Sequence, residues 1–242
     1  MQAALKPRVK ICCIHSLDEA GLAIEAGASA LGLVSKMPSG PGVIPEEMIA
    51  HIAARVPPGV ATFLLTSELD VGSIIAQQKR TGVNTLQIVD RLKFGAHQEL
   101  RAALPGIALV QVIHVRGPES IEEAIAVAPF VNALLLDSGN PSLPVKELGG
   151  TGRTHDWSIS RRIREVVPVP VFLAGGLTGG NVAEAIRQVG PFGIDVCSGV
   201  RTDGRLDTAK LTDFFRAIST VLGPGAASAY LKPALRRLPF RG

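Results

Sequence analysis

The chain has 242 residues, of which 46% are hydrophobic, 4% aromatic and 19% charged, so its core must consist mainly of aliphatic side chains. This length allows one large α/β domain, and such a core suits a protein with buried parallel strands. The formal net charge of +4 comes from scattered basic residues without interleaved aromatic ones, which argues against nucleic-acid binding and agrees with a small anionic substrate.

One unit recurs along the chain, in which a short aliphatic run precedes a turn and an amphipathic segment. Each predicted helix is long enough to cross back over a pair of parallel strands, so the pattern favours a (β/α)8 barrel of the TIM type. An open doubly wound sheet is the main alternative. The predicted strands are 9–13, 30–34, 61–65, 85–89, 108–113, 133–136, 169–174 and 193–197. The predicted helices are 17–26, 45–56, 71–81, 96–104, 119–127, 158–167, 181–189 and 208–221.

No shift of composition or long linker divides the chain, which predicts a single barrel domain over 1–242. Segment 232–241 is the one locally basic stretch, and we interpret the chain from about 224 as a basic C-terminal tail that is solvated or loosely docked. The sequence has no N-terminal apolar segment and no run approaching about 18 apolar residues, so we expect neither secretion nor a membrane partner.

Three cysteines, two of them adjacent, do not make a disulfide framework, which indicates a reducing cytoplasm. Cys12 and Cys13 end the first predicted strand, where side chains alternate, so only one thiol is expected in the barrel mouth. The other thiol must face the helices, and at this rim the Cys12 thiolate could serve as a general base or a nucleophile. A buried structural cysteine is the alternative for either residue.

Active sites of such barrels lie where strands end and the following loops begin. Asp137 ends the apolar run ALLLD, where burial raises the pKa of a carboxyl group and suits it to act as a general acid. The alternative is an aspartate that only caps the next loop. The other strand-end residues of interest are Cys12, Cys13, Asp90, His114, Gly175, Gly176, Ser198 and Gly199.

Two glycine-rich turns follow the seventh and eighth predicted strands, at Gly175-Gly176 and at Ser198-Gly199. Paired turns at these strands form a phosphate cradle in many barrels, because bare backbone N–H groups and a helix N-terminus face one anion. Ordinary tight turns are the alternative. The long loop 139–154 contains Gly149, Gly150, Thr151 and Gly152, which predict either a mobile lid over a ligand or plain flexibility.

The whole set of motifs resembles the phosphoribosylanthranilate isomerase family of tryptophan biosynthesis. The resemblance covers nearly the whole chain, and the order and spacing of the motifs are highly specific. The matching segments are Lys10-Ile11-Cys12, Leu135-Leu136-Asp137-Ser138, Gly149-Gly150-Thr151-Gly152 with Asp156-Trp157-Ser158, Ala174-Gly175-Gly176-Leu177 with Asn181-Val182, and Asp195-Val196-Cys197-Ser198-Gly199-Val200.

This resemblance implies a barrel that converts an aminoaldose phosphate to an aminoketose phosphate by an Amadori rearrangement, without cofactor or metal. It implies that Cys12 is the general base that removes the C2 proton, and that Asp137 is the general acid that opens the ribose ring. It also selects Cys12 as the thiol in the barrel mouth, so we expect Cys13 to pack outward against the helices. Gly175, Gly176, Ser198, Gly199 and Val200 would bind the phosphate, and Lys10, Gln87 and Asp195 would complete the pocket.

Four positions depart from the family pattern. Cys13 replaces the glycine that normally follows the family's cysteine, and the other three departures concern the aromatic acid. Pro41 stands where an arginine is expected to bind the anthranilate carboxylate, Asp90 follows Gln87-Ile88-Val89 where the family has a histidine-containing segment, and Gln111 replaces a common lysine. The first hypothesis is therefore a family isomerase in which Lys36 or Arg91 replaces the lost arginine. The alternative is a divergent barrel that acts on, or only binds, a different phosphosugar. The sequence leaves a homo-oligomer open.

Overall fold

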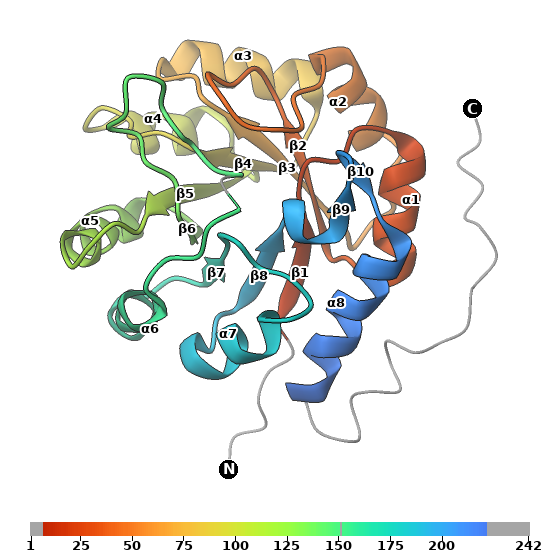
Figure 1. Cartoon of the computed structure of the whole chain (residues 1–242). Coiled ribbons are helices and arrows are strands. Elements are labelled where there is room, and N and C mark those ends of the chain that lie inside the picture. Colours follow the sequence, from red (N-terminus) through yellow and green to blue (C-terminus); the bar gives the residue numbers. More distant parts are fainter. Residues whose placement is uncertain (1–6, 151, 222–242) are drawn as a thin grey trace.

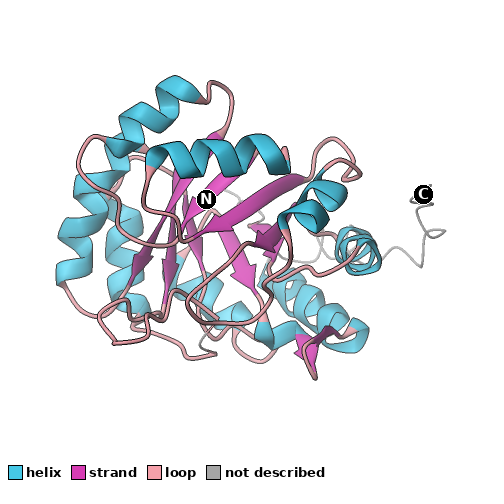
Figure 2. Ribbon diagram, turned by 90° about the horizontal axis from the view of Figure 1, so that it is seen from above, coloured by secondary structure: helices cyan, strands magenta, loops and turns pink. Residues whose placement is uncertain are grey.

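The computed structural model describes residues 7–150 and 152–221, and in this part of the chain eight parallel strands close into a barrel. The strands follow one another in chain order, and the last pairs with the first through Lys10 and Asp195. Helices surround the strands on the outside (Figure 1), and the view from above shows them flanking the barrel wall (Figure 2). The predicted (β/α)8 barrel is confirmed, and the open sheet is excluded because the first strand has two neighbours.

The observed elements agree closely with the repeated unit of the sequence. The strands are β1 (Arg8–Ile11), β2 (Ala30–Val34), β3 (Ala61–Thr66), β4 (Thr85–Ile88), β5 (Ala108–His114), β6 (Ala133–Asp137), β7 (Val171–Leu173) and β8 (Gly193–Val196). The helices are α1 (Leu17–Ala26), α2 (Glu46–Ala53), α3 (Val71–Thr81), α4 (Ala96–Ala103), α5 (Glu119–Val127), α6 (Trp157–Val166), α7 (Val182–Val189) and α8 (Thr208–Val221). Short 3-10 turns occupy Ala128–Phe130 (η1) and Ser198–Val200 (η2), and a small antiparallel hairpin, β9 (Arg201–Thr202) with β10 (Arg205–Leu206), precedes α8.

Two apolar clusters result from the alternation of side chains along each strand. On β2, Leu31 and Leu33 belong to the outer cluster between strands and helices, whereas Ala30 and Val34 belong to the cluster inside the barrel. Phe63 and Phe172 meet inside the barrel with ring centroids 5.9 Å apart. The barrel interior is thus a packed core, and the space for a ligand lies at its carboxyl end.

Four predicted strands are shorter in the structure, and two of them have a clear local physical reason. The seventh strand begins at Val171 instead of 169, because Pro168 and Pro170 have no backbone N–H for the ladder. The first strand ends at Ile11, and Cys13 after it adopts a left-handed φ of 63°. The predicted basic tail lies outside the described residues. Within 7–150 and 152–221, every helix is too short or too polar to traverse a lipid bilayer.

Candidate active site

A pocket opens at the carboxyl end of the barrel. Its walls come from the residues just after β1, β6, β7 and β8, together with the loops between β2 and α2 and between β6 and α6. These segments are distant in sequence and meet because the carboxyl ends of all eight strands lie on one face. The described sequence-predicted residues that line the pocket are Cys12, Gln87, Asp137, Gly149, Gly150, Gly152, Gly175, Gly176, Asp195 and Ser198.

A buried lysine lies directly beneath the pocket floor. Lys10 is fully buried, and its Nζ forms an ion pair with Asp195 Oδ1 at 2.9 Å. Burial alone would lower the pKa of Lys10, but the negative charges of Asp195 and Cys12 outweigh burial and raise it. A methyl group on Gly32 would lie 2.8 Å from Cys12 Sγ and 2.9 Å from Lys10 Nζ, so the two groups converge where only glycine leaves room. A permanent cation therefore faces the Cys12 sulfur.

The Cys12 thiol is buried and its environment favours the thiolate. The strongest influence is a hydrogen bond from Cys13, which lowers the pKa of Cys12 against the effect of burial. The positive charge of Lys10 lowers the pKa further, whereas Asp195 opposes it, and the net pKa lies below the ordinary value. This combination of burial and a stabilised anion is typical of a catalytic thiol.

Cys13 does not pack outward against the helices, and that prediction is wrong. It belongs with Cys12 to the cluster inside the barrel, and both residues line the pocket. Strand alternation no longer applies here, because the left-handed φ of Cys13 turns the chain back toward the mouth. Its Sγ lies 3.7 Å from the carbonyl oxygen of Pro41 and also contacts the Cys197 thiol. Hydrogen bonding to Cys12 and Cys197, with burial, raises the pKa of Cys13, so this thiol stays protonated.

Asp137 reaches the pocket from the end of β6 with only 8% of its surface exposed. Burial raises the pKa of its carboxyl group, although the Ser138 amide donates to Oδ1 at 2.7 Å and the nearby His114 favours the anion. A methyl group on Gly149 would lie 2.8 Å from Asp137 Oδ2, so the loop after β6 closes over the carboxyl group. A thiol whose pKa is lowered and a carboxyl group whose pKa is raised thus share one pocket.

The two glycine turns after β7 and β8 pack against each other. A methyl group on Gly199 would lie 1.9 Å from the Leu177 carbonyl oxygen, so only glycine permits this approach. Gly175 and Gly176 both have positive φ, and the Asn181 side chain donates to the Gly176 carbonyl at 3.0 Å. These contacts bring the predicted phosphate turns to one side of the pocket. Gly199 and Val200 of the same set do not line the pocket. Val200 is fully buried, and its amide donates to the Cys197 carbonyl oxygen at 3.4 Å.

The loop after β2 and the loop after β6, which are far apart in the sequence, meet over the pocket. Ser39 Oγ donates to the Lys146 carbonyl at 2.6 Å, and a methyl group on Gly150 would lie 2.6 Å from Pro41 Cδ. The loop after β2 is therefore held against the loop after β6. Thr151 lies outside the described residues.

The side-chain oxygen of Gln87 has no hydrogen-bond partner among the described residues. Gln87 is buried at the end of β4 and lines the pocket, and the described residues supply no donor for its Oε1. Buried polar oxygens without partners are uncommon, so a ligand donor is expected at this oxygen.

Neither cation suggested by the sequence as a carboxylate partner lines the pocket. Lys36 is exposed, and Arg91 forms an ion pair with Glu123 at 2.9 Å on the outer surface. Gln111, which stands where a lysine is common in the family resemblance, faces α4, where its Oε1 lies 2.9 Å from His97 Nε2. Among the described residues, the pocket lining contains no lysine or arginine. The same described ranges hold no group of three or more histidine, cysteine or acidic side chains suited to a metal ion.

Comparison with known proteins assigns this chain to a family. The profile of the N-(5'phosphoribosyl)anthranilate (PRA) isomerase family matches residues 9–217. The chain belongs to this family. Among curated PRA isomerases, one from Methanosarcina mazei is 35% identical over 209 residues, covering 86% of this chain and 92% of that protein. One from Nostoc punctiforme is 34% identical over 217 residues, covering 88% and 99%.

Solved PRA isomerases share the same barrel. The crystal structure of the enzyme from Thermotoga maritima aligns with a TM-score of 0.76 and 28% identity, covering 88% of this chain and 99% of that chain. A PRA isomerase in complex with reduced 1-(o-carboxyphenylamino)-1-deoxyribulose 5-phosphate aligns with a TM-score of 0.74 and 26% identity, with the same coverage. The resemblance drawn from the sequence motifs is confirmed, and no comparison supports a divergent barrel outside the PRA isomerases.

Proposed function

We propose that this PRA isomerase acts on N-(5'-phosphoribosyl)anthranilate, the substrate for which its relatives are named, in tryptophan biosynthesis. The observation that carries the proposal is the pairing of Cys12 and Asp137 in one pocket, with pKa values shifted in opposite directions. The thiolate and the neutral carboxyl group are the forms that a base and an acid need at the start of the reaction.

Asp137 is the proposed general acid for ring opening. Its protonated carboxyl group donates a proton to the ribose ring oxygen, and the C1–O bond breaks to give an open-chain iminium ion. Burial beneath the loop at Gly149 keeps water from the carboxyl group and holds its pKa high. The released hydroxyl group stays within the same molecule, so no group is lost.

Cys12 is the proposed general base for the second step. Its thiolate removes the proton from C2, and the electron pair moves to neutralise the iminium nitrogen, which gives an enolamine. Cys12 then returns its proton to C1 while the C2 hydroxyl group gives its proton to the Asp137 carboxylate, which yields the aminoketose and restores both residues. Atoms and electrons balance because the reaction only moves hydrogen. Lys10 stabilises the thiolate before this step and remains charged throughout. The reaction needs no redox cofactor.

The phosphate is proposed to bind the turns that contain Gly175, Gly176, Ser198 and Gly199. The support is the contact between the two turns and the positive φ of Gly175 and Gly176, since glycine-rich turns at the ends of these strands are suited to bind an anion through backbone N–H groups. Gly149, Gly150 and Gly152 line the pocket and would cover the substrate, and Gln87 would accept a hydrogen bond from it. We also infer a cytoplasmic location, because the proposed base must remain a reduced thiol.

Cys13→Gly tests the influence of the second thiol on the first. Glycine suits the left-handed φ of this position but cannot donate to the Cys12 sulfur, so the pKa of Cys12 should rise. Because Cys12 must be deprotonated to act as the base, we expect the acid limb of the kcat profile to move to higher pH. The measurement is kcat against pH. Cys197→Ala is the matched control, because it removes the other thiol that contacts Cys13 and leaves the Cys13 thiol in place. An acid limb that stays in place in Cys13→Gly would refute this role.

Pro41→Arg tests how the enzyme holds the anthranilate carboxylate. Pro41 lines the pocket, where the described lining offers no lysine or arginine, so we expect a raised KM in the natural enzyme. A charge-assisted pair contributes about 1.5 to 3 kcal/mol, so Pro41→Arg should lower KM by about ten- to a hundredfold. Pro41→Ala is the control, because it removes the contact with Gly150 without adding charge. Equal KM values for the two variants would rule out a carboxylate site at this position.

A further inference from the structure

In the turn that carries Cys12, no backbone N–H of the described residues donates to the carbonyl groups of Cys12 and Cys13. The Cys12 amide donates to the Val196 carbonyl at 2.8 Å, and the Ile14 amide donates to the Gly32 carbonyl at 3.0 Å. Between these two anchors, Cys13 adopts its left-handed φ, a conformation that costs a residue with a side chain about 1 kcal/mol or more. Something other than the strand ladders must therefore stabilise this turn.

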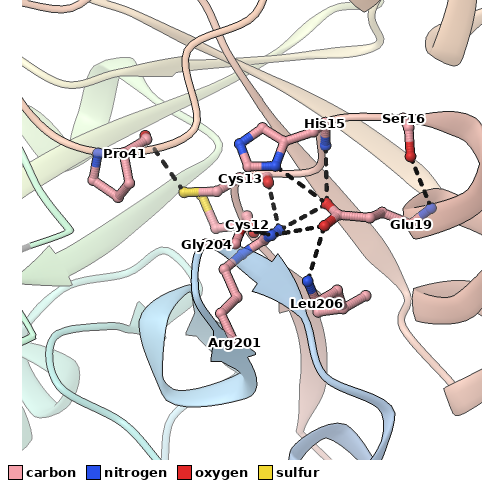
Figure 3. Close-up of polar contacts among 9 residues, drawn as sticks. All are labelled: Cys12, Cys13, His15, Ser16, Glu19, Pro41, Arg201, Gly204 and Leu206. Carbon is pink, nitrogen blue, oxygen red and sulfur yellow. Dashed lines mark hydrogen bonds and ion pairs between the residues drawn. The ribbon is translucent and has the colours of Figure 1, made fainter.

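Arg201 supplies the missing donors. One guanidinium nitrogen, Nη2, donates to the Cys12 carbonyl at 3.2 Å and also to the Cys13 carbonyl. The other terminal nitrogen, Nη1, donates to the Gly204 carbonyl at 2.9 Å. Figure 3 shows the guanidinium between the two cysteine carbonyls and the carboxylate of Glu19. Arg201 is 7% exposed, so these bonds are shielded from water.

Glu19 fixes the guanidinium from the opposite side. Its two oxygens accept from Arg201 Nη1 at 2.9 Å and from Nη2 at 3.0 Å, which is the bidentate geometry. The Leu206 amide donates to Oε1 at 2.9 Å and the His15 amide to Oε2 at 3.0 Å. Burial tends to raise the pKa of Glu19, but hydrogen bonds from Arg201, Leu206 and His15 outweigh it and lower the pKa. The pair therefore remains charged across the neutral range.

We propose that Arg201, held by Glu19, is a positioning residue that clamps the Cys12–Cys13 turn and thereby directs the Cys12 sulfur toward the pocket. Arg201 directly follows the η2 turn that contains Ser198 and Gly199, so one side chain connects the proposed phosphate turn with the proposed base. The proposal rests on the role of Cys12 as the base. Arg201 itself is not assigned a contact with the substrate.

Arg201→Met removes the donors and keeps most of the side-chain volume. We expect kcat to fall by at least about tenfold while KM changes by less than about threefold, because transition-state alignment is lost and ground-state binding is retained. Arg201→Lys should recover only part of the loss, since one ammonium group cannot reproduce a planar set of donors to three carbonyls and a carboxylate. Glu19→Gln should give a smaller fall of the same kind, and it serves as the test if Arg201→Met does not fold.

The decisive readout is the reactivity of Cys12 itself. Iodoacetamide labelling, assigned to Cys12 by tandem mass spectrometry and followed against pH, should show its midpoint shifted upward in Arg201→Met. A thiol displaced from Lys10 and Cys13 loses the groups that stabilise its anion. Arg80→Met is the matched control, because Arg80 also binds a glutamate, Glu46, through two nitrogens but lies on the surface between α2 and α3. We expect it to leave kcat and the labelling profile unchanged.

The outcomes separate this inference from the proposed function. An unchanged kcat and an unchanged labelling profile in both Arg201→Met and Glu19→Gln would overturn the positioning role. If instead Cys12→Ala keeps wild-type turnover, the role of Cys12 as the base fails, while the labelling profile still reports whether Arg201 positions its thiol. A fall in thermal stability without any change in kcat or labelling would show that Arg201 only stabilises the fold, and would also overturn the proposal.

Discussion

Cys12→Ala and Asp137→Asn should each lower kcat by at least about a hundredfold, because a positioned general base or acid contributes a factor of roughly 10² to 10⁴. Alanine cannot accept the C2 proton, and the asparagine amide cannot donate a proton to the ring oxygen. KM should change by less than about threefold in both variants, since the proposed phosphate turns lie on other segments of the pocket and supply much of the ground-state affinity.

The measurement is a steady-state comparison of the two variants with the wild type and with Cys197→Ala. Cys197 is a third thiol at the same pocket, so its replacement controls for the loss of a sulfur atom there. The double variant Cys12→Ala, Asp137→Asn should be little slower than either single variant, because base and acid serve one reaction path. A kcat within tenfold of the wild type in either single variant would remove that residue from the mechanism.

Lys10→Met should destabilise the protein by about 3 to 5 kcal/mol and also reduce turnover. Lys10 is fully buried and is bound to Asp195 at 2.9 Å, so its loss leaves a buried carboxylate without its partner. It also removes the positive charge that lowers the pKa of Cys12, so less thiolate is present at neutral pH. Urea denaturation measures the first effect and the pH dependence of kcat measures the second.

A double variant separates stability from catalysis at this ion pair. Lys10→Met combined with Asp195→Asn replaces the unpaired charge with a neutral side chain, so it should recover a large part of the lost free energy of unfolding. It should not recover turnover, because the cation beside Cys12 is still missing. If Lys10→Met lowers the free energy of unfolding by less than about 1 kcal/mol, the buried ion pair between Lys10 and Asp195 is contradicted.

The barrel could be predicted from the sequence because each strand and helix has a local sequence pattern of its own. The periodic apolar runs place all eight strands within a few residues, and Ser16 marks the start of α1, where its Oγ accepts from the Glu19 amide at 3.2 Å. The strand ends then indicate Cys12 and Asp137 as pocket residues. The local sequence patterns and the topology of the barrel were together sufficient to predict the fold and these two pocket residues.

The orientation of Cys13 could not be read from strand alternation, because alternation holds only while the chain is extended. The sequence held a different signal, since the family resemblance places glycine at this position and glycine favours the positive φ that Cys13 adopts. Contacts between segments that are distant in the chain have no local sequence pattern from which they could be predicted. Arg201 and Glu19 are 182 residues apart in the sequence, and only the closed barrel brings them together.

Conversion of N-(5'-phosphoribosyl)anthranilate by the purified chain, with substrate and aminoketose product separated by chromatography, tests the central claim most directly. The account predicts turnover by the wild type, saturation at a high substrate concentration because Pro41 replaces the carboxylate-binding arginine, and loss of turnover in Cys12→Ala. Wild-type conversion no faster than the uncatalysed reaction at about millimolar substrate, far above the range in which most enzymes saturate, with no gain in Pro41→Arg, would contradict it.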